Sequence, residues 1–569
     1  MEGHAHGIAA RRGPRCRLAI RTRGKCHQNH GSAACSVPAL RFLALFALVL
    51  YPFPCSGASG CLPIPGGKKY SLPSNRGAES RRGGRRGLRG RGAMRTKHLI
   101  PHQAEGYTYA NAYGTTGGGG GGGGNRGGGG GDPFERFPEA VLGLIVSKLP
   151  FKSAVAVSAI SRRWRGVVAA APVLDLDFSA AFPAAPRRRA AFAAAATAAL
   201  ARPQHPLRRL RIALEGLFDQ AFAASAADYL ASWLAAAAAR GVEQLELHLP
   251  RSRLAVLPPS LIACTNLTSL TLRLDRYAHP LPSLCSLTRL SRLHLASIPL
   301  AGDNFFADLF SHCKQLRFLI LEQCRIGALC LAGATQLCSL AITNCSWTQQ
   351  SSVAFSDLPA LRILHYSGSM ANRHLIDDVD SLNEVVLAIE KPQLKLQEPI
   401  LRELLTLVGN VQSLVLSPWC IEQFARPEEW SKVRLNKVRK LACIIERREE
   451  GASSIVPLLA NCQNVEELSL SVVPSQGKRR RCSDEVVYHG VMGCREVVLK
   501  RLRTARMVYI DESKSGLELV KLLLKNTPML EMMTIVPSMD GLEQAKFRRR
   551  VLKFRKASRD ADIQFSATG

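Results

Sequence analysis

Apolar residues recur in one spacing from about Leu207 onward: an apolar residue is followed by others three and five positions later. Offsets three and five fall on one face of a β-strand, so each copy predicts a short strand with that face buried. The clearest copies are Leu267, Leu270, Leu272; Leu290, Leu293, Leu295; Leu316, Leu319, Leu321; Leu337, Leu340, Ile342; and Leu361, Leu364, Tyr366. Weaker copies begin at Leu207, Val242, Leu382, Val411, Val438, Val465, Cys494 and Leu530.

The clear copies begin 23, 26, 21 and 24 residues apart, which is the period of leucine-rich repeats. Cys324 and Cys345 each follow the last apolar residue of a copy by three positions, where this repeat type uses Asn or Cys to turn the chain out of the strand. Later intervals lengthen to 27, 29 and 36 residues. We therefore expect an α/β leucine-rich-repeat solenoid that becomes irregular toward its C-terminal end and presents a binding surface rather than a catalytic pocket.

A different pattern occupies Asp132 to Val168, where apolar residues follow helical spacing. Pro138 is suited to the first position of a helix, and Pro150 disfavours continued helix in Leu149. Between them, the spacing predicts one apolar stripe on this helix, made of Val141, Leu142, Ile145 and Leu149. A second apolar stretch contains Val155, Val157 and Ile160, and Trp164 closes the segment. Helices this short must pack on a partner or on the rest of the chain.

This segment resembles an F-box of the plant type. The residues that support the resemblance are Phe137-Pro138, Val141-Leu142, Ile145, Ser147, Leu149-Pro150, Lys152-Ser153, Ser158, Ser161 and Trp164-Arg165. The resemblance implies that the segment docks on a Skp-type adaptor, and through it on the cullin of a ubiquitin ligase, while the remaining chain captures a target protein. The adaptor-facing or packing set it implies is Phe137, Pro138, Val141, Leu142, Ile145, Leu149, Pro150 and Trp164. Phe137 stands where the family commonly has Leu. The alternative is a three-helix cap on the solenoid, with Trp164 filling its own core.

The C-terminal segment Leu517 to Ile535 predicts a helix, a turn at Asn526 to Pro528 and a final strand. It resembles the FBD region of plant F-box proteins. An Ala-rich stretch from Ala169 to Ala201 predicts an early strand at Asp175 to Phe178 and then a helix. The expected order is a tail (1–131), an F-box (132–170), an Ala-rich connector (171–205), leucine-rich repeats (206–480) and FBD-like repeats with a cap (481–569).

Charge separates the tail from the rest of the chain. Residues 1–131 contain 20 Lys and Arg against 3 acidic residues, so +17 of the net +32 lies there. The Arg-Gly block at Arg81 to Gly92 and the Gly run at Gly117 to Asp132 predict disorder and a flexible linker. The runner-up function is a leucine-rich-repeat scaffold or RNA-associated protein that uses this block to bind phosphates; such binding would weaken steeply with salt. Translation from Met94 would remove nearly all of this charge.

Phe42 to Tyr51, FLALFALVLY, is the one continuous apolar run of note in the sequence. Ten residues are too few to span a bilayer, although the length suits the core of a signal peptide. Secretion would separate an F-box from its adaptor, so the two interpretations exclude each other. We favour the F-box, treat the apolar run as cryptic or untranslated, and expect the nucleus and/or cytoplasm as the location.

Candidate chemistry is sparse. The 17 Cys show no paired C-x-x-C spacing in the body of the chain, which indicates neither a zinc site nor a disulfide framework. No nucleophile-elbow, Walker, zinc-protease or dinucleotide motif occurs in a suitable context, and His248, His294 and His365 fall within or beside predicted strands. We expect a non-catalytic subunit without cofactor, metal, membrane or nucleic-acid partner, which recognises an unknown target for a Skp-cullin-F-box ligase.

Overall fold

The structure is a computed structural model of the 569-residue chain. It describes residue 134 and residues 136–178, 189–201, 205–214, 220–249, 256–275, 277–300, 302, 304–377, 379–391, 397–424, 435–447, 451–473, 497–539 and 541–566. The expectations for the tail, including the Arg-Gly block, the apolar run, Met94 and the Gly run, concern residues outside these ranges. The same holds for Cys494.

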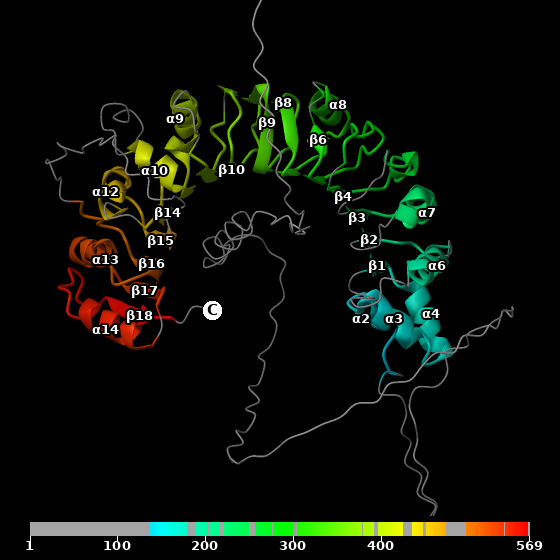
Figure 1. Ribbon diagram of the computed structural model, residues 1–569, viewed down its shortest axis with the longest axis horizontal. Helices are drawn as coiled ribbons and strands as arrows, with labels where there is room; N and C mark the ends of the chain where they lie inside the picture. The colour runs from blue at the N-terminus through cyan, green and yellow to red at the C-terminus, as the bar shows by residue number, and fades with distance from the viewer. Residues whose placement is uncertain are drawn as a thin grey trace, which may run out of the picture. The chain divides into compact units, whose positions relative to one another are not determined.

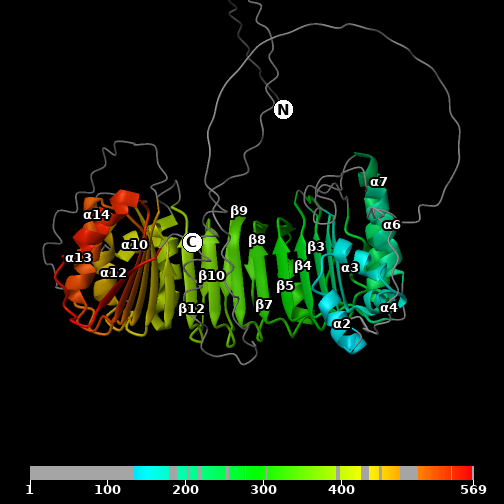
Figure 2. The same ribbon diagram turned by 90° about the horizontal axis from the view of Figure 1, so that it is seen from below.

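The repeats form a continuous parallel sheet in chain order. Its strands are β1 (Val173–Asp177), β2 (Arg209–Ala213), β3 (Gln244–His248), β4 (Ser269–Arg273), β5 (Arg292–Ala296), β7 (Phe318–Glu322), β9 (Ser339–Phe355), β10 (Ile363–Gly368), β12 (Glu384–Ile389), β13 (Ser413–Leu416), β14 (Lys440–Glu446), β15 (Glu467–Val473), β16 (Thr504–Ile510), β17 (Met532–Pro537) and β18 (Asp562–Phe565). Neighbouring strands pair in parallel, and we call each of these strands a rung of the sheet. Figure 2 shows the middle rungs side by side.

Leucines at equivalent repeat positions stand in register across the sheet. Leu270 pairs with Leu293, Leu293 with Leu319, and Leu319 with Leu340. All four are fully buried, and burying one such side chain contributes about 2 kcal/mol. Every clear copy of the predicted pattern coincides with a strand, which confirms the leucine-rich-repeat solenoid.

The chain leaves several rungs through a residue with left-handed backbone geometry. Ser297, Gln323 and Asn344 have φ values of 60°, 53° and 51°, and Gly368 has a φ of 91°. A Cβ atom on Gly368 would lie 2.9 Å from the Asn344 Cα, so this position requires glycine. The thiols of Cys324 and Cys345 then donate hydrogen bonds to Leu295 O (3.3 Å) and Leu321 O (3.4 Å) on the preceding rungs. The two cysteines therefore serve the turn, as predicted.

Helices cover one face of the sheet (Figure 1). They are α6 (Arg189–Leu200), α7 (Gln220–Ala239), α8 (Phe305–His312), α9 (Glu398–Thr406), α10 (Pro418–Phe424), α12 (Gly451–Asn461), α13 (Lys514–Asn526) and α14 (Gly541–Val551), with the 3-10 turns η2 (Pro259–Leu261) and η4 (Leu407–Asn410). In the middle repeats β6 (Pro299–Leu300), β8 (Arg325–Cys330), the second half of β9 and β11 (Arg373–Ile376) form a smaller parallel sheet. We call the face of the main sheet turned away from the helices the inner face.

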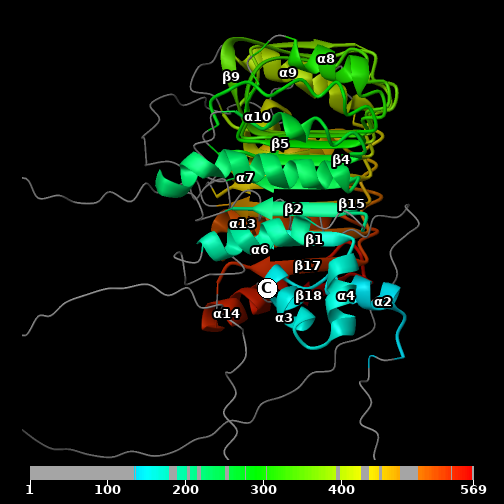
Figure 3. The ribbon, with the colours of Figure 1, turned by 90° about the vertical axis from the view of Figure 1, so that its right-hand side faces the viewer.

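In the described part of the chain, three short helices precede β1: α2 (Glu139–Val146), α3 (Phe151–Ser158) and α4 (Arg162–Ala170). They pack around a small core of their own, formed by Leu142, Val146, Trp164, Val167 and Ala171. Phe151 of α3 meets Phe192 of α6 edge-on at 6.1 Å. The helical module therefore packs beside β1 and α6 (Figure 3).

Several expectations were wrong in detail. Pro138 is the residue before the first helical position of α2, not that position itself. The predicted copy at Cys494 places a strand too early, because Val497 and Leu499 lie in a loop and β16 buries Ala505 and Met507 instead. The strand after α13 is not the last, since α14 and β18 follow it. β18 contains Asp562 and Gln564, so it lacks the run of apolar residues by which the other strands were predicted.

Candidate functional site

Apolar side chains that face solvent are concentrated on the helical module. Of the fifteen large apolar residues that are exposed in the described ranges, six lie between positions 137 and 160. They are Phe137, Val141, Leu144, Ile145, Val155 and Ile160. Single exposed apolar residues are ordinary on a protein surface, but a cluster marks an interaction site. This cluster is therefore the first candidate site.

Helix α2 separates its apolar residues onto two faces. Leu142 and Val146, one turn apart, enter the module core. Val141, Leu144 and Ile145 are 38%, 63% and 40% exposed and share the other side of the helix. Neighbouring positions on a helix differ by about 100°, so Val141 and Leu142 lie at the two edges of the predicted stripe. Leu142 faces the module core, Val141 and Ile145 face solvent, and Leu149 lies beyond the end of α2.

Local hydrogen bonds fix this surface relative to its core. The Ser161 hydroxyl accepts a hydrogen bond from the Trp164 backbone N–H (3.2 Å) and caps α4. The Arg163 guanidinium donates to the Phe137 carbonyl at 2.6 Å. The second contact joins the start of α4 to the residue just before α2, so the exposed apolar residues are held on a defined scaffold.

The inner face of the first strands is charged, and its charges pair with one another. Arg211 of β2 donates to Asp175 (3.0 Å) and Asp177 (2.8 Å) of β1 and to Glu246 of β3 (3.2 Å). Burial alone would lower the pKa of Arg211, but the hydrogen bonds that it donates to Asp177 and Asp175 raise it above its ordinary value. This guanidinium therefore stays charged and links three rungs.

A second ion cluster lies farther along the same face. Arg273 of β4 binds Glu322 of β7 through both carboxylate oxygens, at 3.2 and 2.8 Å, and His294 Nε2 lies 3.1 Å from Oε2. The hydrogen bond with His294 and the charge of Arg273 hold the pKa of Glu322 at about 2, against the effect of burial. Glu322 is therefore ionised at neutral pH and joins β4, β5 and β7.

The inner face of the later strands is apolar instead. A cluster separate from the main core is formed by Val386, Ala388, Val415, Ala442, Ile444 and Val473, which we call the inner apolar patch. It extends over the four neighbouring strands β12 to β15. The inner face thus gains an apolar patch along the solenoid, and the ion pair of Lys440 with Glu467 lies beside it.

Two family models match the chain. The model described as "At1g61320/AtMIF1, LRR domain" matches residues 206–561, more than half of the chain, and the model described as "F-box domain" matches residues 134–173. The chain belongs to the plant F-box/leucine-rich-repeat family.

Similar proteins from Arabidopsis thaliana agree with this assignment. F-box/LRR-repeat protein At1g06630 is 27% identical over 301 residues, which cover 50% of this chain and 71% of that protein. F-box/LRR-repeat protein At3g60040 is 27% identical over 50% of this chain and 67% of that protein. F-box/FBD/LRR-repeat protein At2g26030 is 22% identical over 75% of this chain and 97% of that protein.

The structure distributes the eight predicted F-box site residues between core and surface. Leu142 and Trp164 are buried in the module core, and Leu149 is half-buried. Phe137, Pro138, Val141, Ile145 and Pro150 are exposed. Sequence reasoning missed Leu144 and Ile160 as surface residues. Leu144 stands two positions from both Leu142 and Val146, about 160° around the helix from each, so helical spacing places it opposite the core pair.

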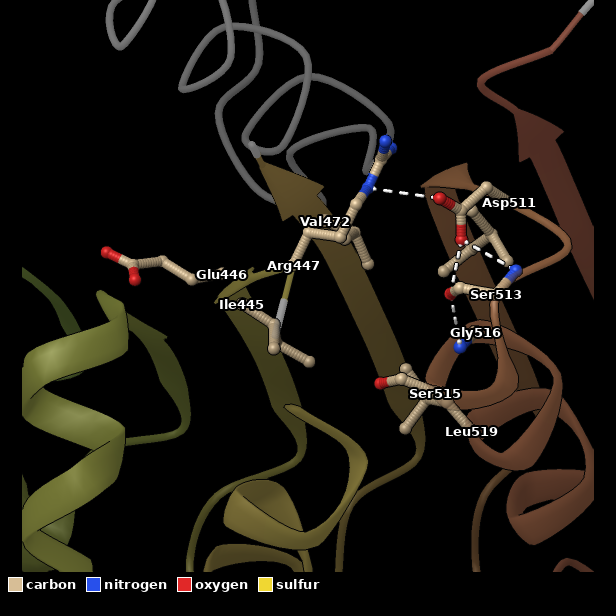
Figure 4. Close-up of a pocket in the computed structure, with 10 residues that line it drawn as sticks. Ile445, Glu446, Arg447, Val472, Asp511, Ser513, Ser515, Gly516 and Leu519 are labelled. Carbon is tan, nitrogen blue, oxygen red and sulfur yellow. Dashed lines mark hydrogen bonds and ion pairs between the residues drawn. The ribbon is translucent and has the colours of Figure 1, made fainter. Parts of the chain in front are cut away.

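A small pocket lies where β14, β15 and β16 meet the start of α13 (Figure 4). Arg447 Nε lies 3.2 Å from Asp511, and the Ser513 hydroxyl donates to the same carboxylate at 2.5 Å. Ser513 also caps α13 by accepting from Gly516 N–H at 3.1 Å. The pocket's polar groups thus bind each other and hold α13 in place.

The histidines singled out from the sequence lie on strands, as predicted. His248 is the last residue of β3, and His294 of β5 pairs with Glu322 of β7. Burial lowers the pKa of His365 in β10 to about 4. His365 is therefore uncharged at neutral pH. Within the described ranges no group of three or more His, Cys, Asp or Glu could hold a metal ion. No described helix combines the length and apolarity needed to cross a bilayer.

Proposed function

We propose that this chain is the substrate-recognition subunit of a Skp-cullin-F-box ubiquitin ligase. In this role the F-box binds a Skp-type adaptor, and the inner face of the repeats binds the protein to be ubiquitinated. The chain performs no chemistry itself. It raises the rate of ubiquitin transfer by holding the target near the ubiquitin carrier, because tethering removes much of the entropic cost of encounter. Such a role places the protein in the nucleus and/or cytoplasm.

The observation that supports the proposal is the apolar surface of the F-box. Val141, Leu144 and Ile145 project from one side of α2 while the opposite side fills the module core. A cap that served only the solenoid would not require apolar residues on its outer side, because water disfavours them there. A helical partner that covers these side chains would bury them.

Binding of purified Skp-type adaptor to the full chain, measured by calorimetry, tests the proposal. The double substitution Val141→Asp, Ile145→Asp should weaken binding at least ~100-fold, about 3 kcal/mol, because two carboxylates would be buried in an apolar interface. Both positions are exposed, so the fold should persist. Trp164 is a poor target for such a test, because it is 7% exposed in the module core and its removal would damage the module.

The matched control is Leu542→Asp, Leu552→Asp, which places the same charges on two exposed leucines of the last repeat. It should bind the adaptor as the unsubstituted chain does. Binding that survives Val141→Asp, Ile145→Asp would contradict the proposal and favour the scaffold alternative, as would a full chain that does not bind the adaptor at all.

A further inference from the structure

The last described helix, α14, is attached to the sheet by one side and presents its other side to solvent (Figure 1). Phe547 and Val551 are fully buried, and the Phe547 ring meets the Phe565 ring of β18 edge-on at 6.4 Å. The Arg548 guanidinium lies over the same Phe565 ring, 5.2 Å from its centre. These contacts fix the rotation of α14 about its own axis, so its outward side is defined.

The outward side of α14 combines a leucine with cations. Lys546 and Arg549 follow Leu542 by four and seven positions, so the three lie within about 60° of one another around the helix. The buried Val551 lies about 180° from Leu542. Leu542 is 83% exposed, the highest value among the large apolar residues exposed in the described ranges. We call Leu542, Ala545, Lys546 and Arg549, which are all exposed, the outer face of α14.

The chain from Lys546 to Arg559 carries a strong excess of positive charge. It contains eight Lys and Arg residues and no Asp or Glu. Two of the eight have partners, since Arg548 stacks on a ring and Lys556 Nζ donates to Ala561 O at 2.8 Å. The other six are exposed and form no ion pair within the described part of the chain. They are Lys546, Arg549, Arg550, Lys553, Arg555 and Arg559.

Cations of the preceding repeats are paired, so this excess is local. Arg503 binds Glu531 at 2.7 Å, and Arg447 Nε lies 3.2 Å from Asp511. An external anion would neutralise the unpaired cations of the last repeat. The exposed leucine narrows the choice of anion, because the phosphate backbone of a nucleic acid offers it no apolar contact. A bilayer with anionic lipids offers both, and helices that lie on membrane surfaces combine cations with leucine in this way.

We propose that the outer face of α14 binds an anionic lipid surface. Leu542 inserts at the boundary between head groups and acyl chains, and Lys546 and Arg549 contact the anionic head groups. Each cation close to such a surface strengthens binding by roughly fivefold. The expectation of no membrane partner rested on the lack of a segment long enough to span a bilayer. A helix that lies on the surface needs no such length.

The consequence for the protein is a second attachment point, which holds the last repeat at the cytoplasmic face of a membrane while the F-box and the inner face stay accessible. The inference goes beyond the proposed function and does not depend on it, since adaptor binding involves the F-box surface and lipid binding involves α14. A failure of one therefore leaves the other standing.

Co-sedimentation of the full chain with phosphatidylcholine vesicles that contain phosphatidylserine tests the proposal, beside vesicles of phosphatidylcholine alone. The double substitution Lys546→Gln, Arg549→Gln should weaken binding to the anionic vesicles by ~10-fold or more, because it removes two contacts with head groups. Leu542→Ala should weaken it by about fivefold or more, because it removes the inserted side chain. Leu542→Ala leaves the net charge unchanged, so the basic tail cannot account for its effect.

The matched controls make the same changes elsewhere on the solenoid. Lys314→Gln, Arg362→Gln removes two exposed cations of the middle repeats, and Leu375→Ala truncates a leucine of β11 that is 54% exposed. Both controls should bind the anionic vesicles as the unsubstituted chain does. All substituted positions are exposed, so urea denaturation should be unchanged in every variant. Calorimetry should also give unchanged adaptor binding for Leu542→Ala.

The proposal requires binding to the anionic vesicles that both α14 variants weaken and both controls leave intact. A full chain that does not bind these vesicles would overturn it, as would equal losses in the α14 variants and the controls, which would indicate attraction by net charge alone. Binding that falls with Lys546→Gln, Arg549→Gln but not with Leu542→Ala would also overturn it. That result would assign the cations to a nucleic acid or an acidic protein segment instead.

Discussion

The F-box and the solenoid contain similar apolar residues at helical or strand spacing, but they use them in opposite ways. The F-box buries Leu142, Val146, Trp164, Val167 and Ala171 and exposes a larger number of apolar side chains. The solenoid places nearly every periodic apolar residue in one continuous core. A hydrophobic pattern thus identifies an element without telling whether its apolar face is a core or an interface. Whether an apolar face is a core or an interface depends on how many other helices and strands of the chain pack against it.

The largest expected effect on stability lies in the solenoid. Leu319 stands between Leu293 and Leu340 on neighbouring rungs and is fully buried. Leu319→Ala should lower the free energy of unfolding by about 3 kcal/mol, because it removes buried methyl groups and leaves a cavity. Urea denaturation followed by circular dichroism measures the loss.

Ile145→Ala is the matched substitution in the F-box, because it removes a similar side chain that is 40% exposed. It should change stability by less than about 0.5 kcal/mol while weakening adaptor binding. Equal losses of stability at Leu319 and Ile145 would show that the F-box surface is part of a core, and the contrast between the two regions would disappear.

A second prediction concerns the charged part of the inner face. The pKa of Glu322 is about 2, below its ordinary value of 4.5, because it binds His294 and Arg273. A lowered folded-state pKa stabilises the fold above the unfolded value, and the contribution is lost as pH falls from about 5 to about 2. Glu322→Gln should therefore cost on the order of 2 kcal/mol at pH 7 and almost nothing at pH 2.

Unfolding curves at several pH values between 2 and 7 measure this difference. Lys391→Gln is a suitable control, since Lys391 is exposed and binds Glu422 at 3.0 Å outside the cluster. A Glu322→Gln deficit that does not shrink in acid would mean that packing, and not charge, is what Glu322 contributes.

The contrast between the solenoid and the F-box also explains which parts of the structure the sequence predicted. Each solenoid rung repeats the spacing of Leu267, Leu270 and Leu272, so one repeat checks the next and the strands could be placed in advance. The F-box has no repeat to check it. Spacing alone placed Leu142 with Val141 and Ile145, although the first faces the core and the others face solvent.

The inner face was beyond prediction for a different reason. The repeat pattern specifies the buried residues of each strand but not the residues between them. Three such intervening residues, paired across neighbouring strands, are Val415, Ala442 and Ser469. They form a surface only when the register brings them together. The pattern of buried leucines fixes that register but says nothing of the residues between them. The residues of this surface therefore could not be chosen from the sequence.

The smallest effect we predict tests whether the F-box is the less stable region. Ser161 caps α4 through the Trp164 N–H, and Ser161→Ala should cost about 1 kcal/mol by leaving that donor without its partner. Ser158→Ala is the control, because its hydroxyl donates only to Val155 O within its own helix and its removal should be nearly neutral. Hydrogen exchange should then accelerate in α2 and α4 of the Ser161→Ala variant and stay unchanged in β7, since a core of five residues can open without the solenoid. Acceleration that extends to β7 would instead mean that the F-box and the repeats unfold together, and that the apolar surface of the F-box is supported by the whole chain.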